Sequence, residues 1–408
     1  MNRKLLLSSS FIIAGLVSAA QDANRTYAIT GDGNGDFLWM NIRQVDIGSG
    51  KVTQDIYQRN KTAFVLADAD SKTPLANFAQ PTATMVAAAA YDKNHDKLFF
   101  TPMRIGELRW LDLNAKGDQK KFYSLRSPLF AASETTRDEA KNFTRMVIGA
   151  DGNGYALTND ASRLIRFSTG KKVVITDLGG LIDDESNKNI SVHNQCSSWG
   201  GDMIADAYNK LYIISANHYV FSVDVDTRVA KYIGYINGLP ANYSTNGAAV
   251  DKDGAIVVSS ANAFAGYYKF TLSDFNAKKI EGSDLVYNAS DLANGNLLFQ
   301  KEADAKKNFG SADFKAVVPV ITNEAHIYPN PVTNSEFKIS FDGQQVGRYN
   351  VIITDLSGKA LMTRTVNIAS KSQVETIQLN RGFAKGVFMV KVTDATNKFI
   401  FTERIVVQ

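Results

Sequence analysis

The sequence predicts an all-β chain with a large repetitive N-terminal region and a small C-terminal β-sandwich. The first reason is a pattern that recurs over the first 320 residues: an apolar strand, a tight polar turn, and a strand that begins at or near Lys or Arg. The second is a set of hairpins with Asn, Asp or Gly at the tip, which precede most of these repeats. The third is a change in character near residue 321, after which short β-rich runs continue to the end.

The first 20 residues have the pattern of a secretory signal peptide. A positive stretch at residues 1–4 precedes an apolar run at 5–17, and small residues follow at 18–20. The apolar run is shorter than the roughly 20 residues that a membrane-spanning helix needs. We therefore expect residues 1–20 to be removed on export, and we find no later segment apolar and long enough to span a membrane.

Residues 21–320 are predicted to form a β-propeller. The repeat units lie about 40–65 residues apart, a spacing typical of propeller blades. Small residues at positions 87–90, 149–150 and 248–249 suit innermost strands, which crowd around a central channel. The first unit begins at its second strand, near Thr26, and the last lacks its fourth, which indicates one blade shared by the two ends of the domain. The pattern favours six blades, with five or seven as open alternatives.

The composition excludes several classes of function. The chain has 45 Lys and Arg against 41 Asp and Glu, a balance that offers no generic surface for nucleic acid. One cysteine excludes an intramolecular disulfide framework, and four histidines argue against a His-rich metal centre. Because no motif of serine hydrolases, zinc proteases, P-loop enzymes or dinucleotide-binding enzymes occurs, no catalytic residue is assigned.

Two short motifs suggest chemistry but have simpler interpretations. The segment from Asp32 to Asp36 begins like a calcium loop, but Phe37 and Arg43 stand where such a loop needs its glycine and its bidentate glutamate. His193 lies three residues before Cys196 in a polar stretch, which does not preset the geometry of a nucleophile and its base. The cofactor stays unknown, with Ca²⁺ at the first loop left open.

One set of residues is predicted to bind a ligand at the mouth of the channel. In propellers, the segments that lead into the innermost strands converge at this mouth. In this chain these segments carry an aromatic ring, a cationic side chain, a carboxylate and an amide. Ring stacking and a few polar contacts suit a glycan or a peptide. The predicted residues are Met85, Arg145, Trp199, Asp202 and Asn246.

Residues 328–408 are predicted to form the small sandwich, after a linker at 321–327. The prolines of Tyr328-Pro329-Asn330-Pro331 fix an extended start, because proline cannot lie within a central strand. A turn at Gly358 and Lys359 separates two of the later strands, and Gly386 precedes another.

This segment resembles the type A C-terminal sorting domain of the type IX secretion system of Bacteroidetes. The matching positions are Tyr328, Pro329, Asn330, Pro331, Gly358, Lys359 and Gly386, whereas Phe388 stands where the family often has Tyr. The resemblance implies Sec-dependent export to the periplasm, passage through the type IX translocon, and removal of the domain by a sortase. It implies that the mature protein lies outside the cell or on the outer-membrane surface.

The sequence therefore predicts a secreted or cell-surface propeller that binds a glycan, a peptide or a surface partner without catalysis. Two alternatives remain open. A metal-dependent hydrolase or lyase needs carboxylates and amides around the channel, for which Asp202, Asn246 and Asp291 are the candidates. A structural protein of the surface layer needs no small ligand.

Overall fold

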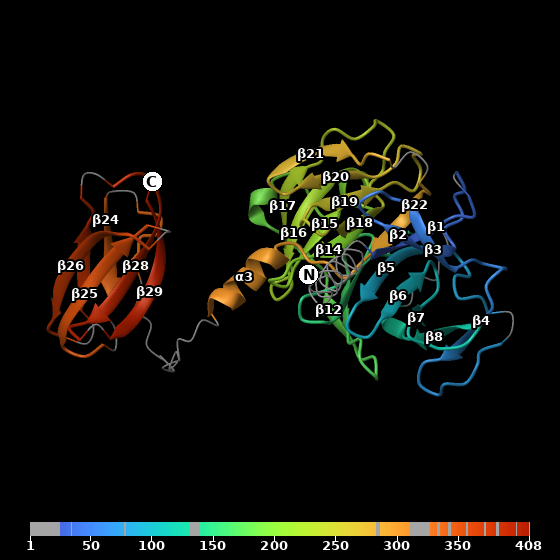
Figure 1. Cartoon of the computed structure of the whole chain (residues 1–408), viewed down its shortest axis with the longest axis horizontal. Coiled ribbons are helices and arrows are strands. Elements are labelled where there is room, and N and C mark those ends of the chain that lie inside the picture. The colour runs from blue at the N-terminus through green and yellow to red at the C-terminus, as the bar shows by residue number, and fades with distance from the viewer. Residues whose placement is uncertain are drawn as a thin grey trace, which may run out of the picture. The chain divides into compact units, whose positions relative to one another are not determined.

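The computed structural model describes residues 25–408 apart from positions 34, 77–78, 131–138, 283–285, 311–326, 333–334, 342–343, 356–357, 371–372, 381–382, 397 and 408. The chain divides into two compact units, residues 1–312 and 313–408 (Figure 1). The predicted signal peptide at 1–20 and the predicted linker, up to residue 326, lie outside the described residues.

The described strands of the first unit form five sheets, and the strands of each sheet are named from the innermost outwards (Figure 1). Blade 1 contains β22 (Ala289–Ala293), β1 (Arg25–Thr30), β2 (Asn41–Asp46) and β3 (Val52–Tyr57). Blade 2 contains β5 (Val86–Asp92), β6 (Lys97–Pro102), β7 (Glu107–Asp112), β8 (Lys120–Arg126) and β4 (Phe64–Asp68). Blade 3 contains β9 (Phe143–Ile148), β10 (Gly154–Thr158), β11 (Leu164–Phe167) and β12 (Ile175–Gly179).

Blade 4 contains β14 (Asp202–Ala205), β15 (Lys210–Ile214), β16 (Tyr219–Asp224), β17 (Val229–Tyr235) and β13 (Ile182–Asp183). Blade 5 contains β18 (Gly247–Val250), β19 (Ile256–Ser259), β20 (Tyr268–Thr271) and β21 (Asp274–Lys279). Neighbouring strands pair antiparallel, except that β4 and β13 join the outer strands β8 and β17 in parallel. Blades 2 and 4 therefore each carry an extra outer strand.

The innermost strands close a ring. Strand β5 contacts β9, β9 contacts β14, β14 contacts β18, β18 contacts β22, and β22 contacts β5. Five clusters of buried hydrophobic side chains each join two neighbouring blades, as expected where apolar sheet faces pack together. The described part of the first unit is therefore a five-bladed β-propeller.

The preferred count of six blades is wrong, and the alternative of five is correct. The last hairpin, around residues 287–299, does not form a separate blade. Instead β22 from this hairpin pairs antiparallel with β1, with Leu292 opposite Ala28, and supplies the innermost strand of blade 1. The two ends of the domain thus share one blade, as the sequence indicates.

Small side chains let the innermost strands approach closely. Alanines at positions 88–90 of β5 and 248–249 of β18 are buried. At Gly247 an added Cβ would lie 2.8 Å from the backbone of Asp291, so a side chain does not fit there. Residues 149–150, in contrast, lie in the turn after β9 and not in an innermost strand.

Helices are short among the described residues. They are η1 (Pro128–Phe130), η2 (Glu185–Asn187), α2 (Gln195–Ser198) and α3 (Gln300–Gly310). Asn194 caps α2, because its side chain accepts hydrogen bonds from the N–H groups of Cys196 and Ser197. In the part of the chain that the structure describes, no helix is long and apolar enough to cross a membrane.

The second unit is a β-sandwich. One sheet contains β23 (Ile327–Tyr328), β24 (Glu336–Ser340) and β27 (Val374–Gln378), and the other contains β26 (Ala360–Ile368), β25 (Gly347–Thr354), β28 (Gly386–Asp394) and β29 (Phe399–Val407). Alternate residues of both sheets face a common core, in which Phe337, Ile353 and Val390 are fully buried. This is the predicted small sandwich.

Candidate functional site

The centre of the propeller is almost filled. The innermost strands leave a void of about 10 Å³, lined mainly by small and aliphatic side chains such as Ala89, Ile204 and Ala249. A single water molecule needs roughly 10–15 Å³. This void is therefore too small for a sugar or a peptide side chain.

Arg145, one of the predicted mouth residues, is fully buried in β9. Its guanidinium donates to the carbonyl oxygens of Thr158 at 3.1 Å and Gly200 at 2.8 Å, and also to those of Asn159 and Ser198. Burial lowers the pKa of this group to about 10, so it is still charged at neutral pH. Arg145 thus joins blade 3 to the loop that leads into blade 4.

Asp202, a second predicted mouth residue, is also buried. Its carboxylate accepts hydrogen bonds from the N–H groups of Met203 and Ala248, both at 2.7 Å, and so connects blades 4 and 5. Burial raises the pKa of Asp202 well above its usual value, although these N–H groups and Arg145 act against the rise. Its role in the structure is to hold two innermost strands together.

Asp291 is the buried partner of Asp202 in the centre. It lies in β22, is fully buried, and neither carboxylate oxygen has a hydrogen-bond partner among the described residues. Burial raises the pKa of Asp291 well above its usual value, and the nearby charge of Asp202 raises it further. The nearby N–H of Ala89 lowers this pKa by less.

The other predicted mouth residues are half-buried. Met85 has a left-handed backbone, with φ of 70°, and its carbonyl accepts a hydrogen bond from the N–H of Met103. The indole of Trp199 donates to the carbonyl of His193 at 3.0 Å, and the Asn246 side chain accepts from the N–H of Ala261. Ligand binding by these residues stays a prediction.

The two weaker motifs form local turns. The carboxylate of Asp36 accepts from the N–H of Asp32 at 2.7 Å, which closes the loop on itself. The Nδ1 atom of His193 lies 2.7 Å from the carbonyl oxygen of Asp160, and Cys196 is exposed on α2. Within the described ranges, no group of three or more His, Cys, Asp or Glu side chains is arranged to hold a metal ion.

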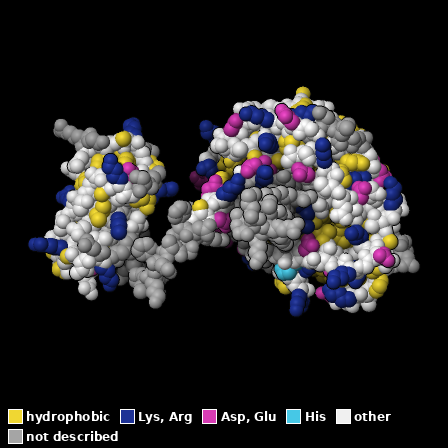
Figure 2. Space-filling view, in the orientation of Figure 1, with side chains coloured by type: hydrophobic (Ala, Val, Ile, Leu, Met, Phe, Trp, Pro, Cys, Tyr) yellow, Lys and Arg dark blue, Asp and Glu magenta, His cyan; other side chains and the backbone are white. Residues whose placement is uncertain are grey.

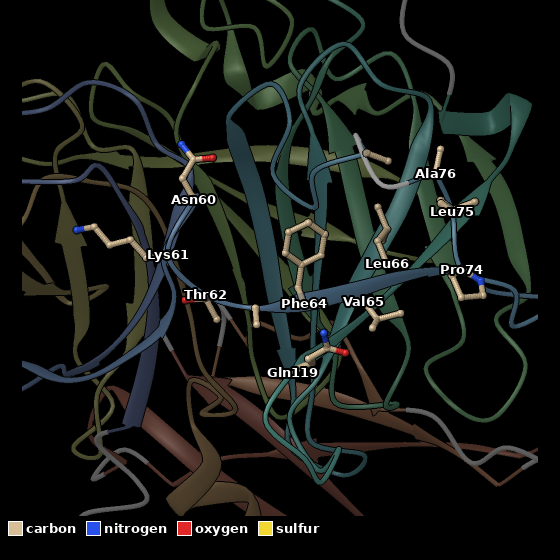
Figure 3. Close-up of a pocket in the computed structure, with 12 residues that line it drawn as sticks. Asn60, Lys61, Thr62, Phe64, Val65, Leu66, Pro74, Leu75, Ala76 and Gln119 are labelled. Carbon is tan, nitrogen blue, oxygen red and sulfur yellow. The ribbon is translucent and has the colours of Figure 1, made fainter.

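A groove of about 600 Å³ lies along the outer strand of blade 2 (Figure 3). Strand β4 forms its floor, with Asn60 and Lys61 at one end and Pro74, Leu75 and Ala76 at the other (Figure 3). Pockets that hold small ligands enclose roughly 300–1,000 Å³ and are mostly apolar with a few polar groups. The size of this groove lies in that range, and its lining combines apolar and polar side chains.

The groove is not predicted by the sequence interpretation. The run from Phe64 to Leu66 is short and apolar, lies outside the recurring repeats, and is compatible with an ordinary buried strand. The groove exists because β4 joins the far side of β8 in parallel, 56 positions earlier in the chain, with Phe64 opposite Lys120. The one sequence feature that could have indicated the extra strand is this apolar run, because it does not belong to any of the recurring hairpins.

Blade 2 also holds a buried ion pair, between Glu107 and Arg109. The carboxylate of Glu107 accepts from Arg109 at 2.6 Å and from Ser124 in β8 at 2.7 Å. Burial raises the pKa of Glu107, but the hydrogen bonds from Ser124 and Arg109 outweigh it and hold the pKa below its usual range.

Elsewhere on the propeller, Lys and Arg alternate with Asp and Glu on the face seen in Figure 2.

In the sandwich, the predicted motif residues lie at two separate places. The Asn330 side chain accepts from the N–H of Val406 at 3.0 Å and donates to the carbonyl of Arg404, so the Tyr328–Pro331 stretch is tied to β29. Gly358, with φ of 85°, and Lys359 belong to the turn between β25 and β26, where both N–H groups bond to Asp355. Gly386 begins β28.

The comparisons with known proteins agree with this division. Residues 326–408 match the family described as "Secretion system C-terminal sorting domain", which confirms the predicted resemblance. A sorting domain of this kind implies export through the type IX secretion system to the cell surface or the extracellular space. No curated protein matches the chain.

Among solved structures, the chain is similar to PorZ, a surface component of the type IX secretion system of Porphyromonas gingivalis. The two are 16% identical, and the alignment has a TM-score of 0.33. It covers 94% of this chain and 51% of PorZ. The chain thus spans about half the length of PorZ. Virginiamycin B lyase of Staphylococcus aureus is 11% identical over 79% of this chain and 84% of its own, with a TM-score of 0.32. Similarities at this level carry no argument about function.

Proposed function

We propose that this protein is an exported, non-catalytic binding module whose ligand occupies the groove beside β4. Residues 1–20 act as the signal peptide, and the propeller at 21–320 is the cargo. The domain at 328–408 directs the chain through the type IX translocon and is then removed by a sortase. The ligand is a glycan, a peptide or a surface partner.

The contrast in free space supports the groove as the binding site. The groove encloses about 600 Å³, whereas the void in the channel is about 10 Å³. Two of the five predicted mouth residues, Arg145 and Asp202, are buried and hydrogen-bonded to backbone. They cannot contact a ligand without leaving those partners unsatisfied, which costs about 1–3 kcal/mol for each buried group.

The lining of the groove supports binding without catalysis. The described residues that line it include no His, Cys, Asp or Glu, which are the usual acids, bases, nucleophiles and metal ligands. Its polar groups, at Asn60, Lys61, Thr62 and Gln119, are suited to hydrogen bonds and to one ion pair.

The binding site is tested with two tryptophan variants of the full chain. Ala76→Trp fills the groove, and Ala241→Trp places the same ring at an exposed turn elsewhere. A panel of glycans and peptides is screened by thermal shift, since a ligand at 100 times its Kd adds about 2.7 kcal/mol to the free energy of unfolding. We expect ligands that stabilise the wild type and Ala241→Trp but not Ala76→Trp.

Three results contradict the binding proposal. The first is a panel without any stabilising ligand. The second is a ligand that stabilises Ala76→Trp as much as the wild type. The third is release of product from the ligand by the wild-type chain, which makes the protein an enzyme.

The export route is tested separately in a bacterium that has the type IX system. Deletion of residues 328–408 is expected to leave the chain in the periplasm, whereas the full chain reaches the surface or the medium. Cell fractionation measures both. Export of the deleted chain at the normal level contradicts the assigned role of the domain.

A further inference from the structure

The groove beside β4 has an incomplete sheet edge as its floor. Strand β4 pairs with β8 through its odd-numbered residues, since Ala63 accepts from Lys120 and Ala69 donates to Ser124. In a parallel pair, alternate residues bond to the partner strand and the others point to the opposite edge. The backbone groups of Phe64, Leu66 and Asp68 therefore face away from β8.

Only half of this outer edge is paired. Asp68 donates to Thr73, Leu66 accepts from Leu75 at 2.8 Å, and Ala67 pairs antiparallel with Pro74. Beyond Leu75, the backbone carbonyl of Ala76 accepts from the N–H of Ala79 and not from β4. Within the described ranges, the N–H and C=O of Phe64 and the N–H of Leu66 have no hydrogen-bond partner.

We infer that an extended peptide binds at this edge as an added strand, antiparallel to β4 and in line with residues 73–75. The inference rests on the proposed function, because it names the class of ligand for the same groove. An exposed edge with free N–H and C=O groups is the site at which extended peptides add to a sheet. A peptide residue opposite Phe64 would donate to its C=O and accept from its N–H.

The side chains around the edge specify the character of the peptide. Phe64 and Leu66 point to one side of β4 and Val65 to the other (Figure 3). Leu75 and Ala79 add apolar surface to the walls, so alternate apolar residues of the peptide find contacts. Lys61 is exposed at one end and has no ion pair with any residue that the structure describes. An acidic residue at that end of the peptide would pair with it.

The test uses the full chain and a fluorescent library of ten-residue peptides, with Val, Ile, Thr or Phe at alternate positions and one Asp or Glu at either end. Binding is measured by fluorescence anisotropy. The best binder is then resynthesised with a single N-methyl group at each residue in turn. If the peptide adds as a strand, an N-methyl group at the one residue opposite Phe64 weakens binding about tenfold or more, and methylation at either of its neighbours changes binding less than threefold.

Variants of the protein locate the peptide. Ala76→Trp is expected to weaken binding at least tenfold, with Ala241→Trp unchanged. The Lys61→Glu variant is expected to bind a peptide that has Lys in place of the acidic residue more tightly than the original peptide. The Lys61→Gln variant is expected to bind both peptides equally. Far-UV circular dichroism of each variant confirms that the propeller is folded.

The outcomes separate this inference from the proposed function. Peptide binding that no single N-methyl group weakens more than its neighbours do, or no peptide binding at all, overturns strand addition. If a glycan binds instead and Ala76→Trp abolishes its binding, the groove is still the binding site but strand addition is wrong. If no ligand depends on Ala76, both proposals fail.

Discussion

The centre of the propeller and the outer edge of blade 2 use their polar groups in opposite ways. In the centre, Arg145 and Asp202 are buried and hydrogen-bonded to backbone, in a space with a void of about 10 Å³. At the edge, backbone groups of Phe64 and Leu66 stand free beside a groove of about 600 Å³. Convergent polar residues in the centre thus hold the ring together, whereas an incomplete outer sheet leaves backbone groups unpaired beside a groove.

The largest effect is expected at the centre, for Arg145→Met. The substitution leaves four carbonyl groups, three of them buried, without this donor, and we expect the free energy of unfolding to fall by about 3–5 kcal/mol. Urea unfolding followed by tryptophan fluorescence reports on the propeller, because all three tryptophans precede residue 200. Arg104→Met, at an exposed side chain, is the matched control and should change little. An Arg145→Met propeller as stable as the control would mean that the centre does not depend on this residue.

A smaller loss of folding stability is expected for Glu107→Gln in blade 2. The pKa of Glu107 is held below its usual 4.5 in the folded state. Its contribution to stability is therefore present above pH 4.5 and is lost as the pH falls through the folded pKa. We expect the substitution to cost about 2 kcal/mol at pH 7 and to flatten the stability profile on the acid side. Urea midpoints between pH 3 and pH 7 measure this, and an unchanged acid slope would contradict it.

The opposite sign is expected for Asp291→Asn in the centre. The pKa of Asp291 is raised above 3.8 in the folded state, so its contribution is most favourable below pH 3.8 and is lost as the pH rises through the folded pKa. Asn carries no charge to bury, so the variant should be more stable than the wild type at pH 7, by about 1 kcal/mol or more. Asp118→Asn, at an exposed position, is the control. A less stable Asp291→Asn chain at pH 7 would show that the carboxylate has a stabilising partner there.

The smallest effect is expected for Trp199→Ala on ligand binding. The indole is half-buried and bonded to the carbonyl of His193, and it lies in blade 4's entry loop, not in the groove of blade 2. Peptide affinity measured by fluorescence anisotropy should change less than twofold, against at least tenfold for Ala76→Trp. A larger loss of affinity for Trp199→Ala than for Ala76→Trp would place the binding site at the mouth of the channel and not at the edge of blade 2.

Much of the fold follows from local patterns. Alternating apolar residues and Asx-Gly turns define the hairpins, and the small residues at 88–90 and 248–249 indicate innermost strands by their size alone. The blade count does not follow, because β22 and β1 pair across more than 250 positions and the spacing of repeats cannot show which unit they complete. The mouth residues are predicted from their chemistry, and burial of Arg145 and Asp202 cannot be deduced from that chemistry.

Local patterns are sufficient to predict the all-β class, the hairpin repeats, and the C-terminal sorting domain with its motif from Tyr328 to Pro331, because these depend on residues that are close together in the chain. The closure of the ring by five blades, the burial of the central charges and the open edge of β4 are visible only in the assembled fold. These features arise from pairing and packing between segments that are distant in the sequence. A strand edge is free or occupied according to where its neighbours end, and that is settled only when the sheet is assembled.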